Sequence, residues 1–182
     1  MKREPFGILI CGLNGCGKTT IGRKLAEKLG FYPMDVENYY FRPEDECYSE
    51  PRSREEVLRL LLQDMERHPQ FVLSAVKGDL GEEIVRKYHL VIYLTAPWEV
   101  RGERIQRRSY DRFGIRVEQG GDLYEQEQAF LRFAKGRTDV HIEKWLETLT
   151  CPVLRLDATR PIDEILQQIC CYIDEMQTPT VI

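Results

Sequence analysis

The chain has 182 residues, of which 42% are hydrophobic and 31% are charged, and its formal net charge is −4. This size and composition are typical of one globular domain that needs no disulfide or metal ion to fold. Proteins that bind nucleic acid non-specifically are usually basic, so the net charge weighs against that class.

The six cysteines show no Cys-x-x-Cys pair and no zinc spacing, which favours reduced thiols in a cytosolic protein. The N-terminal apolar run is too short for a signal peptide or a membrane span. We therefore expect one cytoplasmic domain over residues 1–182, without a membrane or nucleic-acid partner, as a monomer or homodimer.

In chain order, the first element is a strand over Phe6–Cys11, because this run is almost entirely apolar, as a strand buried on both faces must be. A glycine-rich turn follows, and then a helix that ends at Gly30. The apolar residues of this helix recur every four positions, at Ile21, Leu25 and Leu29.

The next strand is expected over Phe31–Asp35, where Pro33 favours an edge position. Residues 36–52 are polar and are expected to be irregular. Ser53 and Glu56 then have the spacing of a capping box, which predicts the start of a helix.

Three more strands are predicted by short apolar runs at Phe71–Val76, Leu90–Leu94 and Val153–Leu156. Pro97 and Pro161 are each expected to open a helix. Residues 109–121 are polar and glycine-containing, which predicts a mobile loop, and a helical stretch broken near Gly136 follows, up to about Leu149. Five strands alternating with about seven helices predict an α/β fold, a three-layer α/β/α sandwich with a parallel sheet and right-handed crossovers.

The glycine-rich turn at residues 12–19 matches G-x-x-x-x-G-K-[ST], the P-loop motif, between a predicted strand and a predicted helix. Its glycines allow backbone N–H groups to converge on phosphates, Lys18 places a charge near the β- and γ-phosphates, and Thr19 offers a hydroxyl to Mg²⁺. ATP and Mg²⁺ are therefore the expected cofactors. The predicted nucleotide-binding residues here are Gly12, Leu13, Asn14, Gly15, Cys16, Gly17, Lys18, Thr19 and Thr20.

Two classes of P-loop protein are disfavoured by the sequence. Motor-type and AAA-type ATPases carry an acidic pair directly after a long apolar strand, whereas this chain has Lys77-Gly78-Asp79 after one strand and Thr95-Ala96-Pro97 after another. The Asn-Lys-x-Asp guanine signature of regulatory GTPases is also missing from the sequence.

The stretch Gly12–Gly30 resembles the small P-loop kinases of the shikimate kinase and adenylate kinase group, and Asp35-Val36-Glu37 resembles the Asp-x-Asp of shikimate kinases. The resemblance implies that Asp35 holds Mg²⁺ through water or accepts the substrate hydroxyl, so that Thr19 and Asp35 would form the metal site. A helix cap or a solvated turn residue is the alternative interpretation of Asp35.

Arginine recurs along one face of a predicted helix and into the next loop, at Arg101, Arg104, Arg108, Arg112 and Arg116. The pair Arg104 and Arg108 resembles the arginines that lead into the lid of adenylate kinases, which implies that the first stacks on the base and the second reaches the phosphates. Arg137 resembles a returning lid arginine. The alternative is a solvated basic face paired with the acidic residues Glu99, Glu103 and Asp111.

The loop of residues 157–161 resembles the one that packs on adenine in this family, which implies a nucleotide contact at Thr159. The chain departs from shikimate kinases at residues 76–79, where those enzymes carry three glycines. We expect an acceptor pocket between residues 35–60 and 77–82, under a lid of about 109–121. Its predicted substrate-binding residues are Asp35, Glu37, Arg54, Lys77, Gly78, Asp79 and Arg112, although Arg54 also suits a helix first turn.

Together these features predict a kinase that moves the γ-phosphoryl group of Mg-ATP to a nucleoside, a nucleotide or a shikimate-like metabolite. The predicted catalytic residues are Lys18, Asp35, Arg108 and Arg137, with Asp79 as a second candidate for the base. A nucleotide-binding regulatory ATPase or adaptor is the alternative. A third class, RNA binding through residues 101–116, fits the acidic total charge less well.

Overall fold

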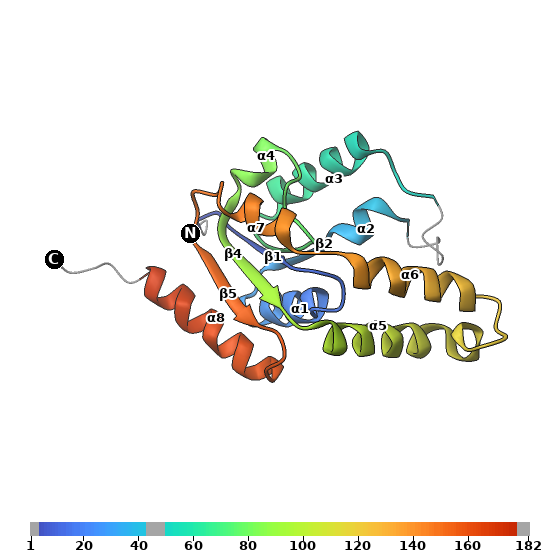
Figure 1. The fold of residues 1–182 in the computed structure, drawn as a ribbon. Coiled ribbons are helices and arrows are strands. Elements are labelled where there is room, and N and C mark those ends of the chain that lie inside the picture. Colours follow the sequence, from blue (N-terminus) through green and yellow to red (C-terminus); the bar gives the residue numbers. More distant parts are fainter. Residues whose placement is uncertain (1–3, 43–49, 178–182) are drawn as a thin grey trace.

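The computed structural model describes residues 4–42 and 50–177, which form a five-stranded parallel sheet with helices on both faces (Figure 1). The strands are β1 (Phe6–Cys11), β2 (Tyr32–Asp35), β3 (Gln70–Ser74), β4 (Tyr88–Thr95) and β5 (Val153–Asp157). Their order in the sheet is β2-β3-β1-β4-β5, so β2 lies at the edge, where Pro33 predicted it. The predicted fold class is confirmed. Residues 43–49, which include Cys47 and part of the expected acceptor region 35–60, lie outside the described residues.

The helices in the described residues are α1 (Lys18–Leu29), α2 (Val36–Tyr40), α3 (Arg54–Arg67), α4 (Glu82–Val85), α5 (Trp98–Phe113), α6 (Tyr124–Gly136), α7 (Val140–Leu146) and α8 (Ile162–Gln177), with a 3₁₀ helix η1 (Gly114–Val117). The Ser53 side chain accepts a hydrogen bond from the Glu56 N–H at 3.2 Å, so the predicted cap of α3 is present. None of these helices is long and apolar enough to cross a membrane.

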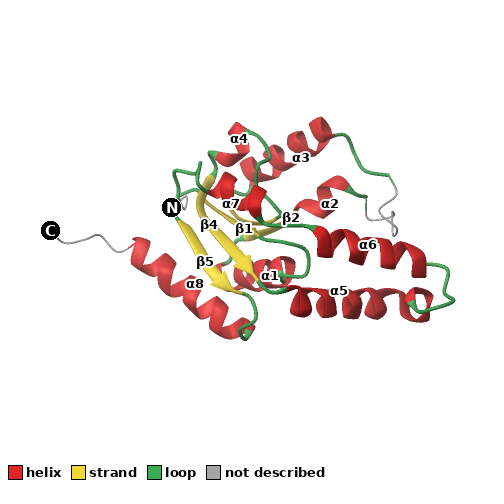
Figure 2. Cartoon of the chain, viewed as in Figure 1, coloured by secondary structure: helices red, strands yellow, loops and turns green. Residues whose placement is uncertain are grey.

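Two hydrophobic cores sandwich the sheet, because alternate residues of each buried strand face opposite sides. Leu9 and Cys11 pack in the core that is covered by α3, α4 and α7. Ile8 and Ile10 pack in the core that is covered by α1 and α8. Figure 2 shows the resulting layers of helices around the strands. The carboxyl ends of the parallel strands therefore meet at one edge, where the P-loop joins β1 to α1.

Two segments that the sequence predicts to be irregular are helical. Residues 36–40 form α2, and the predicted loop 109–121 is largely the last turn of α5 followed by η1. Helices α5 and α6 with η1 form a helical arm that extends away from the sheet (Figure 1). The arm has a small hydrophobic cluster of its own, which Ile105, Leu131 and Ala134 build with Trp98 and Phe130. This cluster contains no residue of 109–121, which agrees with the polar composition that made this segment resemble a loop.

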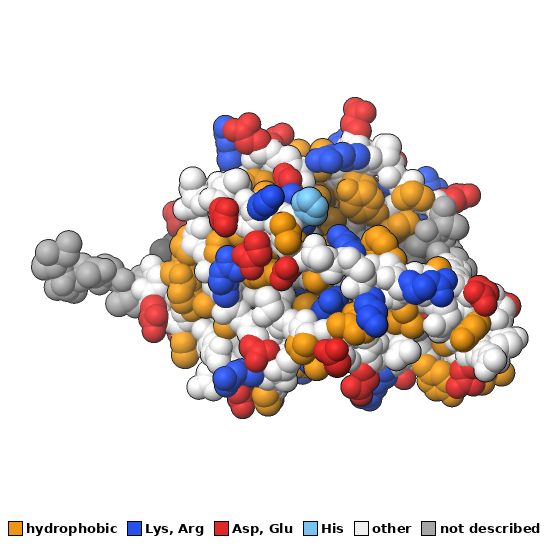
Figure 3. All heavy atoms as spheres, viewed as in Figure 1, with side chains coloured by type: hydrophobic (Ala, Val, Ile, Leu, Met, Phe, Trp, Pro, Cys, Tyr) orange, Lys and Arg blue, Asp and Glu red, His pale blue; other side chains and the backbone are white. Residues whose placement is uncertain are grey.

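Charges of both signs are mixed over the molecular surface. Lys and Arg side chains alternate with Asp and Glu side chains on the face drawn in Figure 3. This mixture agrees with the small net charge of −4.

Candidate active site

The P-loop, residues 12–19, turns tightly between β1 and α1. Gly12, Gly15 and Gly17 have φ angles of 144°, 86° and 83°, a region that side chains with a Cβ avoid. Space is also short, because a Cβ on Gly12 would lie 2.3 Å from the Leu94 carbonyl oxygen and one on Gly15 would lie 2.5 Å from the Arg101 carbonyl oxygen. The glycines therefore satisfy both a backbone conformation and a close approach to β4 and α5.

The first turn of α1 presents a positive charge where a helix favours a negative one. Gly17 is its N-cap, the turn contains no acidic residue, and Lys18 is its first residue. Burial lowers the pKa of the Lys18 ammonium group, whose Nζ donates to the Leu13 carbonyl oxygen at 3.0 Å. A half-buried cation at a helix N-terminus is an unfavourable arrangement that a bound anion would offset, and phosphate is the anion that suits converging N–H groups.

Asp35, the last residue of β2, lies against the P-loop. Thr19 Oγ1 donates to Asp35 Oδ2 at 2.7 Å, and Asp35 Oδ1 accepts from the Glu37 N–H at 3.2 Å, which caps α2. Asp35 is thus a helix cap and a neighbour of the P-loop at once, so the two interpretations of the sequence are compatible. The hydroxyl and carboxylate oxygens of this pair are the ligand type that Mg²⁺ prefers.

Two arginines hold Asn14, at the tip of the P-loop. Arg101 is 5% exposed and donates through Nη1 to the Asn14 carbonyl oxygen at 3.2 Å and through Nε to the Ala96 carbonyl oxygen at 3.1 Å. Arg137 Nη1 donates to Asn14 Oδ1 at 3.2 Å. Sequence reasoning assigned Arg101 no role beyond the arginine stripe, and its burial is visible only once α5 is placed against the P-loop.

The other arginines on this face of α5 have different neighbours. Arg104 Nη2 donates to the Ala158 carbonyl oxygen at 2.9 Å, which brings it to the loop after β5 where Thr159 lies. Thr159 itself donates through its N–H and Oγ1 to Asp157 Oδ1, at 2.9 and 2.7 Å. Asp111 lies 4.0 Å from Arg107, a residue outside the predicted set.

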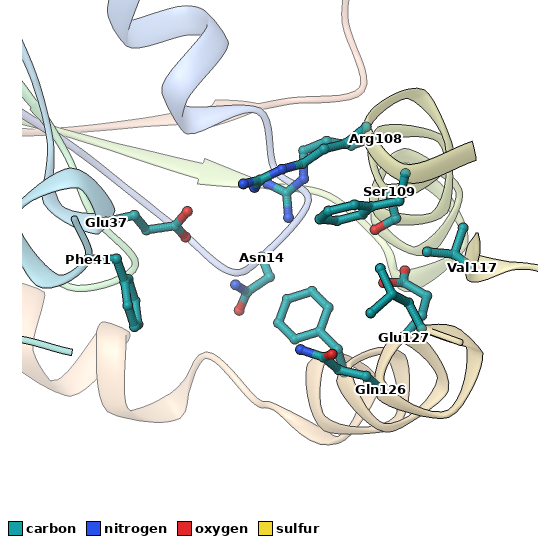
Figure 4. A pocket seen from close by; sticks show the side chains of 12 residues that line it. Asn14, Glu37, Phe41, Arg108, Ser109, Val117, Gln126 and Glu127 are labelled. Carbon is teal, nitrogen blue, oxygen red and sulfur yellow. The ribbon is translucent and has the colours of Figure 1, made fainter. Parts of the chain in front are cut away.

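A cavity of about 450 Å³ opens between the P-loop, α2 and the helical arm. Figure 4 shows Glu37 and Phe41 on one side of it, Asn14 in the middle, and Arg108, Gln126 and Glu127 on the arm side. The structure thus gathers four predicted site residues around one space, namely Asn14, Glu37, Arg108 and Arg112. No sequence pattern predicted that Gln126, Glu127 or the phenylalanines would line this cavity, because α6 was expected only as a generic helix.

Lys77 and Asp79 lie elsewhere, in a second hollow of about 540 Å³ that they share with His141 and Trp145. They form an ion pair of 2.9 Å with each other. Gly78 is packed against the core, since a Cβ there would lie 2.2 Å from Leu9 Cδ2. Residues 77–79 therefore do not line the cavity beside the P-loop.

Arg54 and Thr20 are exposed on the first turns of α3 and α1. Arg54 lines neither of the two hollows. Its neighbour Arg52 instead donates to the carbonyl oxygens of Tyr39 at 2.9 Å and of Phe41 at 3.3 Å, which ties α2 to the start of α3. Arg52 is a further residue that sequence reasoning missed.

The cysteines near the site behave as core residues. Cys16 is 1% exposed, and burial raises the pKa of its thiol. Burial likewise raises the pKa of the Cys11 thiol to about 12. Since the thiolate is the reactive form, both thiols are unreactive in this state.

A protein-family model described as an AAA domain matches residues 8–129. The chain belongs to this family. The matched span begins in β1, contains the whole P-loop, and ends within α6. The family carries the description of AAA-type ATPases, the class that the missing acidic pair disfavoured, whereas the relatives that match include shikimate, adenylate and cytidylate kinases.

Relatives of known sequence include the protein YqaC of Bacillus subtilis, which is 29% identical over 91% of this chain and 96% of its own length. A shikimate kinase of Chlorobium chlorochromatii is 30% identical over 70% of this chain and 72% of its own length. Adenylate and cytidylate kinases also match. The resemblance to the shikimate kinase and adenylate kinase group is therefore confirmed.

Among solved structures, a shikimate kinase from Acinetobacter baumannii in complex with shikimate aligns with a TM-score of 0.59. The alignment covers 98% of this chain and 97% of that protein at 19% identity. Identity this low shows the shared fold, and the P-loop kinase fold is the one shared.

Proposed function

We propose that this protein is an ATP-dependent phosphotransferase that moves the γ-phosphoryl group of Mg-ATP to a small-molecule hydroxyl or phosphate. The observation that carries the proposal is the juxtaposition of a P-loop with a separate cavity lined by Glu37, Arg108 and Arg112. A P-loop alone suits any nucleotide-binding protein. An adjoining space with both acidic and basic side chains supports an acceptor-using enzyme.

The residues present fit ATP and Mg²⁺. The turn of Gly12–Thr19 gives converging backbone N–H donors for phosphate oxygens. Lys18 adds a positive charge at the N-terminus of α1, where a cation is unfavourable until an anion binds beside it. Thr19 and Asp35 would hold the metal ion, which when bound neutralises charge on the phosphates.

In the proposed reaction the acceptor oxygen forms a bond to the γ-phosphorus while the bond from that phosphorus to the β–γ bridging oxygen breaks, and ADP leaves. In this reaction Asp35 would accept the acceptor proton, and Arg108 and Arg137 would stabilise charge on the transferring group. Such catalysis consists mostly of positioning and electrostatics. The helical arm would shield the reaction from water.

The test is an ADP-release assay with Mg-ATP against a panel of nucleosides, nucleoside monophosphates, shikimate and gluconate, with water as the control. We expect at least one acceptor to raise ADP release clearly above the water rate. A rate that is the same with every acceptor and with water would instead indicate a nucleotide-binding regulator or adaptor.

Asp35→Asn is expected to lower kcat by roughly 10²-fold or more, because it removes the charge that serves the metal ion and the acceptor proton. Asparagine still caps a helix, so α2 and the melting temperature should change little. The measurement is kcat as a function of Mg²⁺ concentration. The matched control is Asp163→Asn, an exposed aspartate in the first turn of α8. Normal kcat and an unchanged Mg²⁺ requirement in the Asp35 variant would contradict the assignment.

A further inference from the structure

The cavity has two chemically different ends. Near the P-loop it is bounded by Asn14 and Glu37, and on the arm side by residues of α5, η1 and α6 (Figure 4). The lining is largely apolar and includes Phe41, Phe113 and Phe130. A cavity of this size with a few polar groups in an aromatic lining is the usual form of a small-molecule site.

The nucleotide itself is expected on the other side of the P-loop. Arg104 is bonded there to the Ala158 carbonyl oxygen, beside the loop after β5 that the sequence predicts to contact the adenine. Neither residue lines the cavity. The aromatic cavity is therefore left for the second substrate.

Glu127 marks one position in the cavity where a ligand donor would be favourable. Its Oε1 atom is buried and has no hydrogen-bond partner among residues 4–42 and 50–177. A buried carboxylate oxygen without a donor destabilises the folded protein, and native structures seldom retain one without a use. A ligand that brought an N–H or O–H group to this atom would remove that cost.

The phenylalanine rings restrict what such a ligand can be. A sugar acid or cyclic polyol can place only its C–H faces against these rings, and each of its hydroxyls that is buried there needs a polar partner elsewhere in the lining. A planar nitrogen heterocycle would instead stack on the rings with its whole face, a favourable contact that every base can make.

The geometry points to an acceptor that is a nucleoside or nucleoside monophosphate with an amine-bearing base, and to Glu127 as the residue that selects the amine. This inference rests on the proposed function, of which it names the substrate class. The base lies at the arm end beside Phe113 and Phe130, with its amine donating to Glu127 Oε1. Arg108 and Arg112 line the cavity and carry the positive charge that a monophosphate would face, and the reacting group points toward the P-loop.

The test compares ligands that differ at one group. Adenosine is paired with inosine and cytidine with uridine, each also as the 5′-monophosphate, with shikimate and gluconate as polyol probes. Binding is measured by calorimetry in the presence of Mg²⁺ and a non-hydrolysable ATP analogue, and transfer by ADP release with Mg-ATP. We expect the amine-bearing member of at least one pair to bind and react at least tenfold better than its carbonyl partner, a difference of about 1.4 kcal/mol.

Glu127→Met removes the acceptor oxygen while keeping the side-chain length. We expect this variant to lose the preference for the amine at least tenfold, with the KM for ATP unchanged and a melting temperature that is equal or higher. Glu125→Met, an exposed neighbour on α6, is the matched control and should keep the preference.

Three results would overturn the inference, namely equal binding of both members of every pair, phosphorylation of a polyol but of no nucleoside, or a preference that survives in Glu127→Met. Polyol phosphorylation would leave the proposed function standing. A preference for the amine in calorimetry without ADP release from any acceptor would support the ligand assignment and refute the phosphotransferase activity.

Discussion

Lys18→Ala is expected to reduce kcat by roughly 10³-fold or more, the scale on which enzymes depend on one preorganised charge at the transition state. The Lys18 ammonium group already lies within the P-loop, bonded to the Leu13 carbonyl oxygen, so its loss leaves the γ-phosphoryl charge without its nearest cation. Nucleotide affinity should fall as well. ADP release and nucleotide binding by calorimetry measure the two effects separately.

The control is Lys24→Ala, which removes an exposed lysine from the same helix and should leave both values unchanged. Lys18→Ala removes a charge that is unfavourable at the start of α1. The variant should therefore fold normally, with a melting temperature at or slightly above that of the native protein. Full activity in a folded Lys18→Ala variant would refute the role of the P-loop in phosphoryl transfer.

Gly15→Ala is expected to destabilise the protein by about 2–3 kcal/mol, because alanine at positive φ is strained and its Cβ has no room. The φ angle is 86°, and the new Cβ would lie 2.5 Å from the Arg101 carbonyl oxygen and 2.9 Å from the Arg101 Cα. For a chain of this length the loss corresponds to a drop of about 5–10 °C in melting temperature. Nucleotide binding should weaken in parallel, since the strain lies in the phosphate-binding turn.

Gly136→Ala is the matched control for this strain. Gly136 is the last residue of α6, and no heavy atom lies within 4 Å of the Cβ that alanine would add. The same Gly-to-Ala change should therefore be neutral or stabilise slightly, by about 0.4–1 kcal/mol. Equal melting temperatures for the Gly15 and Gly136 variants would show that the P-loop can relax without cost.

Local sequence was sufficient for those parts of the site that depend on neighbouring residues. The P-loop is readable because its glycines are required by the backbone of one tight turn, whatever surrounds it. Asp35 was found because it ends a strand, and the carboxyl ends of parallel strands converge. The confirmed edge position of β2 likewise follows from Pro33, which cannot donate to a neighbouring strand.

Predictions failed where a segment takes its structure from distant partners. Residues 109–121, at the end of the arm, were predicted as a loop because they are polar and contain glycine, whereas α5 continues to Phe113 and η1 follows it. Lys77 and Asp79 come shortly after the end of β3 at Ser74, and the chain carries them to a hollow beside α7. A residue that follows a strand is expected near the carboxyl edge of the sheet. The direction of its side chain depends on how the next helix packs.

Short-range spacing along the chain was enough to specify the phosphate-binding turn, the alternation of strands and helices and the kinase-like class. The packing of distant segments was needed to bury Arg101 behind the P-loop and to bring Phe41 and Glu127 to one cavity. Phe41 and Glu127 lie far apart along the chain, and their meeting depends on how α2 and α6 pack around the carboxyl edge of the sheet. No local pattern encodes such a contact, because a cavity is a property of the surfaces that surround it.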